Sequence, residues 1–238
     1  MPAQPDADGT YRRHGPTPAR GRLVPLVVGA LLAADLALIA AYPILQLLGY
    51  RINLLALPAE QSLPNWYSTA KLLDLAQLLA VLAWVLPAPT RRARCVLLAP
   101  AALFLLLSLE ETISIHERLV NELLVPLLGG SGRGGFWSLL LGLPLAAAMV
   151  AGGVAYGRLV RPSRSTLAKA AAGTAVFLAG AVGADILADF LAERTTARVL
   201  AATAEEGGEL VGTTLLIWAA LDLVAREWRS GGWAPRGG

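Results

Sequence analysis

Six apolar segments, each long enough to cross a membrane, constrain this chain more than any other feature. They span residues 23–48, 65–86, 94–120, 136–160, 167–191 and 199–225. At about 1.5 Å per residue, each helix would cover the roughly 30 Å of a bilayer's hydrocarbon core. Only helices satisfy their own backbone in lipid without closing a barrel, and no short alternating strands occur. The sequence therefore predicts an all-α bundle of six transmembrane helices.

The composition agrees with a multi-pass membrane protein. Hydrophobic residues make up 55% of the chain and charged residues only 16%. Cys95 is the single cysteine, which excludes an intramolecular disulfide and disfavours a zinc-thiolate site. The net charge of +3 comes mostly from arginines between the apolar segments, so membrane topology explains it better than nucleic-acid binding does.

The basic residues predict the orientation. Residues 1–22 are rich in Pro, Gly, Ala and Arg, and we interpret them as a disordered tail. Residues 23–226 form the transmembrane domain and residues 227–238 a short second tail. Most of the 20 basic residues lie in these tails and in alternate loops, so the positive-inside rule places both termini in the cytoplasm, in the inner membrane of a bacterium.

Acidic residues gather toward the opposite, outer side. The segment SLEETISIHERLVN carries Glu110, Glu111, His116 and Glu117, and seven-residue spacing would place Glu110 and Glu117 on one helical face. The fifth and sixth segments add further carboxylates at similar depth, namely Asp185, Asp189, Glu193, Glu205, Glu206 and Glu209. Ionisable groups at membrane depth need partners or a function, so we expect an outward-facing polar site.

Carboxylates and an imidazole from several helices are typical of metal sites in helical bundles. The metal-ligand candidates are Glu111, His116, Asp185, Asp189, Glu206 and Glu209, and this set suits Mn, Fe, Mg or Zn. Catalytic candidates are Glu110, Glu111, His116 and Glu117. The Glu-x-x-His pattern of diiron bundles is absent. Salt bridges to Lys71, Arg118, Arg194 and Arg198 are the structural alternative.

Two further polar stripes predict an interior cavity. The second segment carries Lys71, Asp74 and Gln77, and the first carries Asp35 near the middle of the membrane. Such residues should face the bundle interior rather than lipid. The inner half of the bundle has few polar residues to continue them.

Two pairs of glycines are spaced for close helix packing. Gly153 and Gly157 lie four residues apart, as do Gly208 and Gly212. Small residues at this spacing let transmembrane helices approach closely, so we expect packing at both pairs.

Three stretches resemble signatures of uncharacterised bacterial multi-pass proteins. They are EQSLPNWYS, LSLEETISIHERL with Glu-Glu-x4-His-Glu, and EEGGELVG with Glu-Glu-x-x-Glu. The resemblance implies that the three stretches form one unit and carries no activity with it. Seven-helix hydrolases of the alkaline-ceramidase type need several histidines, and this chain has two.

Three functions follow as hypotheses. The first is a metal-dependent enzyme acting on a lipid or isoprenoid substrate at the outer polar site. The second is a proton- or cation-coupled transporter that uses Asp35, Lys71 and Asp74. The third is a non-enzymatic scaffold in which the charges only hold helices together.

Overall fold

The computed structural model describes residues 23–50, 52–59, 61–119, 122, 125–128, 135–184, 186–187 and 196–229. Residues 1–22 and 230–238, which include most of both predicted tails, lie outside this part. The described residues form helices and no strand, which confirms the all-α prediction. The elements are α1 (Leu23–Leu47), η2 (Asn53–Leu55), α2 (Leu63–Val85), α3 (Arg91–Ile113), α4 (Ile115–Arg118), α5 (Val125–Leu128), α6 (Gly135–Val160), α7 (Arg164–Leu178), the π-helical η4 (Ala179–Ala184) and α9 (Thr196–Arg229).

Six of the described helices are long and apolar enough to cross a membrane, as predicted. They are α1, α2, α3, Gly142–Val160 of α6, α7 continued by η4, and α9. Many of their large apolar side chains point outward; Leu26, Leu47 and Trp84 are 68%, 79% and 86% exposed. Apolar surface this extensive belongs in lipid, because soluble monomers rarely expose it.

Hydroxyl side chains begin three of these helices. Ser62, Thr90 and Ser163 each accept a hydrogen bond from the backbone N–H three residues further along. An N-cap of this kind satisfies one of the donors that the first turn of a helix leaves without a partner. The starts of α2, α3 and α7 are therefore determined locally.

The third apolar segment is shorter than predicted. We expected one helix over residues 94–120, but α3 ends at Ile113 and Ser114 adopts a left-handed conformation with φ 49° and ψ 52°. The short α4 follows directly. A left-handed residue ends helical hydrogen bonding, so Glu110 and Glu117 lie on two different helices. The predicted common face for these two residues is wrong.

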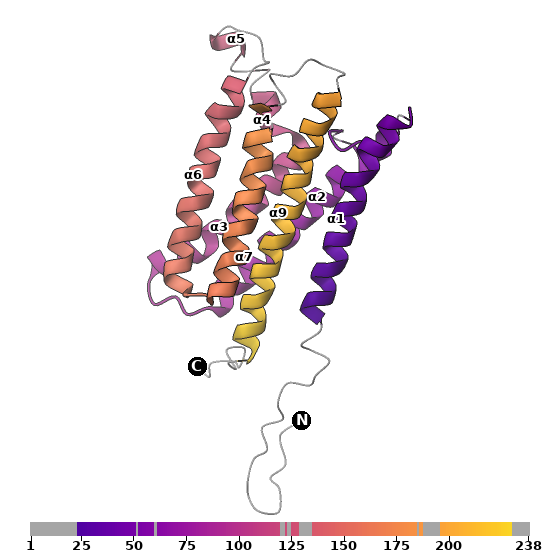
Figure 1. Cartoon of the computed structure of the whole chain (residues 1–238). Helices are drawn as coiled ribbons and strands as arrows, with labels where there is room; N and C mark the ends of the chain where they lie inside the picture. The colour runs from indigo at the N-terminus through magenta and orange to yellow at the C-terminus, as the bar shows by residue number, and fades with distance from the viewer. Residues whose placement is uncertain are drawn as a thin grey trace, which may run out of the picture.

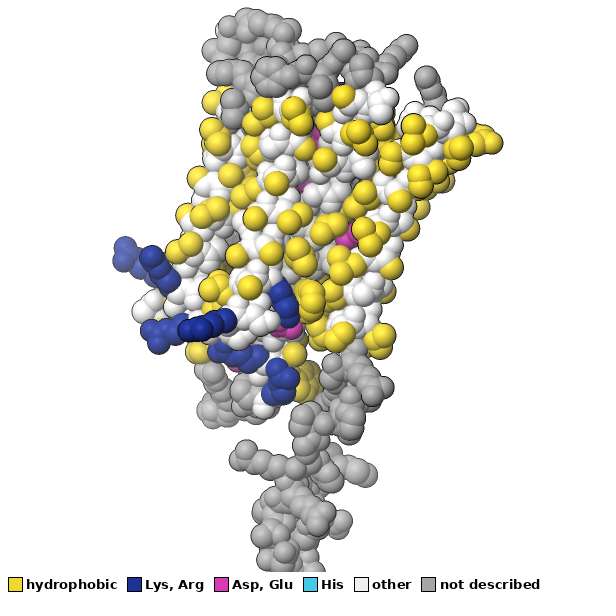
Figure 2. Space-filling view, viewed as in Figure 1, with side chains coloured by type: hydrophobic (Ala, Val, Ile, Leu, Met, Phe, Trp, Pro, Cys, Tyr) yellow, Lys and Arg dark blue, Asp and Glu magenta, His cyan; other side chains and the backbone are white. Residues whose placement is uncertain are grey.

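The six spans alternate in direction, so α1 begins and α9 ends at the same end of the bundle (Figure 1). Lys and Arg side chains gather at this end, which we call the basic end (Figure 2). Its described members are Arg91, Arg92, Arg94, Arg158, Arg161, Arg164, Lys169, Arg226 and Arg229. That this end faces the cytoplasm stays a prediction.

α9 lies at the centre of the packing and contacts α1, α2, α7 and η4. Its contact with α7 and η4 brings backbone against backbone. A Cβ added to Gly212 would lie 2.6 Å from Phe177 N, and one added to Gly208 would lie 2.8 Å from Gly180 Cα. No side chain fits there without a backbone shift, which confirms close packing at Gly208 and Gly212.

The second glycine pair behaves differently. A Cβ on Gly153 would meet nothing within 4 Å, and one on Gly157 would meet only Leu167 Cδ1, at 4.0 Å. The prediction of close helix packing at these two residues is therefore wrong. α6 stands at the edge of the bundle (Figure 1). Its Gly153 and Gly157 leave space beside them.

Candidate functional site

Five carboxylates of the predicted outer site come together at the end opposite the basic end. Glu209 on α9 lies within electrostatic range of four others, namely Glu110 and Glu111 at the end of α3 and Glu205 and Glu206 on α9. All five side chains are partly buried. We call these five residues the outer carboxylate cluster.

The structure does not describe the side chains of the remaining predicted site residues. The backbones of His116 and Glu117 belong to α4, but the positions of their side chains fall outside what the structure describes. Asp185 and Asp189 also lie outside the described residues. Among the described residues, no group of three or more His, Cys, Asp or Glu side chains has an arrangement that could hold a metal ion. The metal site predicted from the sequence, which includes these other residues, stays a prediction.

Asn65 fixes the orientation of the cluster's Glu111. Its side-chain amide donates to the Glu111 carbonyl oxygen at 3.0 Å and to Glu111 Oε1 at 3.2 Å. One turn below, Ser108 Oγ donates to Thr69 O at 3.0 Å. The start of α2 and the end of α3 are thus tied together by polar contacts, and the carboxylate is held between them.

A buried ion pair lies near the middle of the spans, between α1, α2 and α9. Lys71 Nζ on α2 lies 2.6 Å from Asp35 Oδ1 on α1. The two side chains are 2% and 0% exposed, respectively. Lys71 Nζ also donates to the Leu210 carbonyl oxygen at 2.7 Å, and Thr214 Oγ1 donates to Asp35 Oδ2 at 2.6 Å. Both carboxylate oxygens therefore have a partner.

Tyr67 completes the surroundings of this pair. Its ring centroid lies 4.9 Å from Lys71 Nζ, and its hydroxyl donates to the Leu31 carbonyl oxygen at 3.2 Å. An ammonium over an aromatic face is attracted by the ring's negative electrostatic potential. Charges taken this far from water are costly unless paired and hydrogen-bonded, and this arrangement supplies both compensations.

The prediction that Asp74 faces the bundle interior together with Lys71 is wrong. Asp74 lies on an exposed face of α2, as does Gln77. The two residues are three and six positions after Lys71. That spacing rotates them progressively around the helix, and only Lys71 points to the centre of the bundle.

A second ion pair lies nearer the basic end, between α7 and α9. Lys169 Nζ lies 2.5 Å from Asp222 Oδ2, and the side chains are 21% and 25% exposed. Lys169 Nζ also lies 4.2 Å from the Trp218 ring centroid. This pair was not predicted from the sequence. The feature of the sequence that could have indicated it is the spacing of Trp218 and Asp222, which puts an aromatic ring and a carboxylate one helical turn apart.

α9 carries polar groups at three levels of the membrane. Glu206 belongs to the outer carboxylate cluster, Thr214 contacts the central pair, and Asp222 forms the pair near the basic end. These residues are eight positions apart, so the levels are separated by about 12 Å along the helix axis. The polar groups thus extend into the half of the bundle where the sequence indicated few.

A family model matches residues 23–225, from the first residue of α1 to within one turn or so of the end of α9. No curated protein and no solved structure matches the chain. Among the six described helices that can span a membrane, the match covers five completely and α9 up to residue 225. The polar sites described above therefore lie inside the family's domain rather than in an appended segment.

Proposed function

The chain belongs to the family described as a domain of unknown function (DUF8692). From its own polar residues, we propose that the protein carries out proton- or cation-coupled transport. The central binding element is the Asp35–Lys71 pair. The six apolar helices make this a multi-pass membrane protein. We propose that it lies in the inner membrane of a bacterium.

The observation that carries the proposal is the burial of Asp35 against both Lys71 and Thr214. An ionisable pair in the middle of transmembrane helices marks an ion path more often than it marks simple packing, because a hydrophobic pair of similar size would be cheaper there. The carboxylate has two separate donors, one charged and one neutral. An entering cation or proton can therefore compete with Lys71 for Asp35 while Thr214 keeps the carboxylate in place.

The other two polar levels support a path on either side of the pair. The outer carboxylate cluster concentrates negative charge at one end, and such charge attracts cations from solution. Glu209 is adjacent in the chain to Leu210, whose carbonyl accepts from Lys71. The Lys169–Asp222 pair continues the polar groups toward the basic end. Water between these levels would complete the connection.

Purified protein in proteoliposomes with an imposed pH gradient tests the proposal. We expect the wild type to dissipate the gradient and Asp35→Asn to slow this strongly. Asp74→Asn is the matched control, because it makes the same change on an exposed face of α2. Thr214→Val is a second test that leaves the ion pair in place and removes only the Thr214 hydroxyl. A wild-type rate that survives Asp35→Asn in folded protein would refute proton movement through this site, and the same assay with Na⁺ or K⁺ gradients applies to other cations.

The outer carboxylate cluster favours a second candidate, the metal-dependent enzyme acting on a lipid or isoprenoid substrate. The carboxylate of Glu209 lies within electrostatic range of four others. A divalent ion such as Mn, Fe, Mg or Zn, held by Glu111, Glu206 and Glu209 together with His116, Asp185 and Asp189, would stabilise this negative charge. Metal content of the wild type beside Glu111→Gln/Glu209→Gln tests this candidate. A stoichiometric metal that the double variant loses would support the enzyme, whereas metal-free wild-type protein that moves protons would support transport alone.

A further inference from the structure

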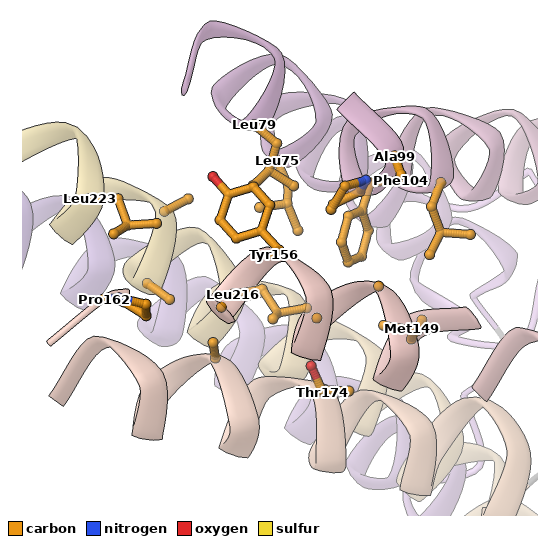
Figure 3. A pocket seen from close by; sticks show the side chains of 18 of the residues that line it. Leu75, Leu79, Ala99, Phe104, Met149, Tyr156, Pro162, Thr174, Leu216 and Leu223 are labelled. Carbon is orange, nitrogen blue, oxygen red and sulfur yellow. The ribbon is translucent and has the colours of Figure 1, made fainter. Parts of the chain in front are cut away.

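An apolar cavity of about 370 Å³ lies between α2, α3, α6, α7 and α9, and none of its lining residues belongs to the three polar levels. Ligand sites typically enclose roughly 300–1,000 Å³, so this volume suits a ligand. Figure 3 shows side chains from these helices around it, with the Tyr156 ring beside Leu75 and Leu79. The lining is almost entirely hydrocarbon, including Phe104, Met149 and Leu216.

Small residues of α6 create the space. Gly152 and Gly153 line the cavity, and a Cβ added to either would meet nothing within 4 Å. The two glycines therefore leave a gap beside α3 and α7 instead of packing tightly. In a membrane such a gap between helices is filled by hydrocarbon, because an empty space forfeits dispersion contacts.

The cavity lies in the half of the membrane next to the basic end. Its lining on α6 extends to Gly157 and its lining on α7 begins at Thr166, so it reaches the loop between these helices. Three arginines adjoin the lining there, namely Arg158, Arg161 and Arg164, and all three are exposed. Within the described part of the chain, no acidic side chain forms a salt bridge with any of them.

The start of α7 adds to this positive charge. The N-terminus of a helix carries a partial positive charge and normally favours an acidic residue in its first turn. α7 has no acidic residue in its first turn and begins with Arg164. An arginine at that position is unfavourable for the helix dipole, and an anionic group at the mouth of the cavity would complement both positive charges.

We propose that this cavity holds one acyl chain of an anionic phospholipid whose phosphate lies against Arg158, Arg161 and Arg164. The acyl chain fills the apolar space beside Gly152, and the lipid headgroup stays at the membrane surface of the basic end. Charge complementarity selects the headgroup, and the apolar lining holds the chain. This lipid site is independent of the proposed transport function, since it shares no residue with the three polar levels.

The test uses full-length protein in vesicles of equal parts phosphatidylglycerol and phosphatidylcholine. After detergent extraction and purification, mass spectrometry counts both lipids retained per protein. We expect the wild type to retain phosphatidylglycerol preferentially. Gly152→Leu, which fills the cavity, should lower its retention by about tenfold, the effect of losing a few buried methylene groups. Gly29→Leu is the matched control, because Gly29 is also open on all sides but lies on α1, away from the cavity.

The headgroup contact has its own variant. Arg158→Gln/Arg161→Gln/Arg164→Gln should remove the preference for phosphatidylglycerol, while Arg91→Gln/Arg92→Gln, on another loop of the basic end, should keep it. Gly152→Ala, whose small side chain fits the open space, verifies that helix α6 tolerates a change at this position. The proposal would be overturned by a wild type that retains neither lipid, by equal retention in Gly152→Leu and Gly29→Leu, or by a preference that survives the triple substitution.

Discussion

Lys71 on α2 lies 2.6 Å from Asp35 on α1, and neither side chain reaches the surface of the bundle. The two residues are 36 positions apart in the chain. Thr214 and the Leu210 carbonyl join the same pair to α9, so one ion pair connects three helices. Its energetic role can be separated from its proposed role in transport.

Removing one partner of this pair should destabilise the bundle strongly. Lys71→Met leaves the Asp35 charge buried without its cation, which typically costs about 3–5 kcal/mol. The double variant Asp35→Leu/Lys71→Met should recover much of that loss, because no isolated charge remains. Thermal unfolding in detergent, followed by tryptophan fluorescence, measures both.

Lys169→Met is the control for the same substitution at the more exposed pair. It should cost less than Lys71→Met, because Lys169 and Asp222 are 21% and 25% exposed and the charge left behind is less deeply buried. Equal effects of Lys71→Met and Lys169→Met would mean that burial of the central pair has no energetic consequence.

The close approach of α7 to α9 predicts a strong effect of a single methyl group. Gly212→Ala would place a Cβ within 2.6–2.7 Å of the Phe177 backbone and must push the helices apart. Such overpacking typically costs about 1–3 kcal/mol. Gly153→Ala, which meets open space, should be neutral or slightly stabilising. Melting temperatures of the two variants give the comparison, and a lower value for Gly153→Ala than for Gly212→Ala would contradict it.

Two tyrosines should respond oppositely to loss of the hydroxyl group. Tyr156 is buried, and within the described residues its hydroxyl has no hydrogen-bond partner. Tyr156→Phe should therefore leave stability unchanged or raise it. Tyr67→Phe loses the bond to the Leu31 carbonyl and should cost about 0.5–1.5 kcal/mol. Urea or thermal unfolding distinguishes them, and a large loss in Tyr156→Phe would reveal a partner for its hydroxyl.

The orientation predicted from arginine and lysine can be tested with single cysteines. In a Cys95→Ser background, Leu54→Cys lies at the outer end and Pro89→Cys at the basic end. Both native side chains are exposed. The positive-inside rule predicts that a membrane-impermeant maleimide labels only Leu54→Cys in intact cells and both variants after permeabilisation. The reverse pattern would place the basic end outside.

Much of the architecture could be predicted from the pattern of apolar residues. Segments of some 20 to 30 residues must become helices in lipid, whatever they pack against. The ends of those helices were less predictable. Nothing in the run from Leu107 to Leu119 distinguishes a continuous helix from one broken at Ser114, because a left-handed serine depends on its surroundings.

The outer carboxylate cluster was predictable in part. Glu110, Glu111, Glu206 and Glu209 were expected at one end, and the structure brings them within electrostatic range. The hydrogen bond from Asn65 could not be predicted, since its partner Glu111 lies 46 positions away in the chain. The pairing of Asp35 with Lys71 and the exclusion of Asp74 likewise depend on how α1, α2 and α9 are rotated about their axes.

The sequence by itself determined the number of membrane-spanning helices and the end at which basic side chains gather, because both follow from the free energy of placing each residue in lipid or water. Only the tertiary structure decided which charges meet and which glycines pack. Gly208 and Gly212 contact a neighbouring backbone, whereas Gly153, in the same sequence pattern, borders a cavity. Association of helices in lipid is driven by close packing and hydrogen bonds rather than by hydrophobic burial. Those short-range contacts exist only once the helices are assembled.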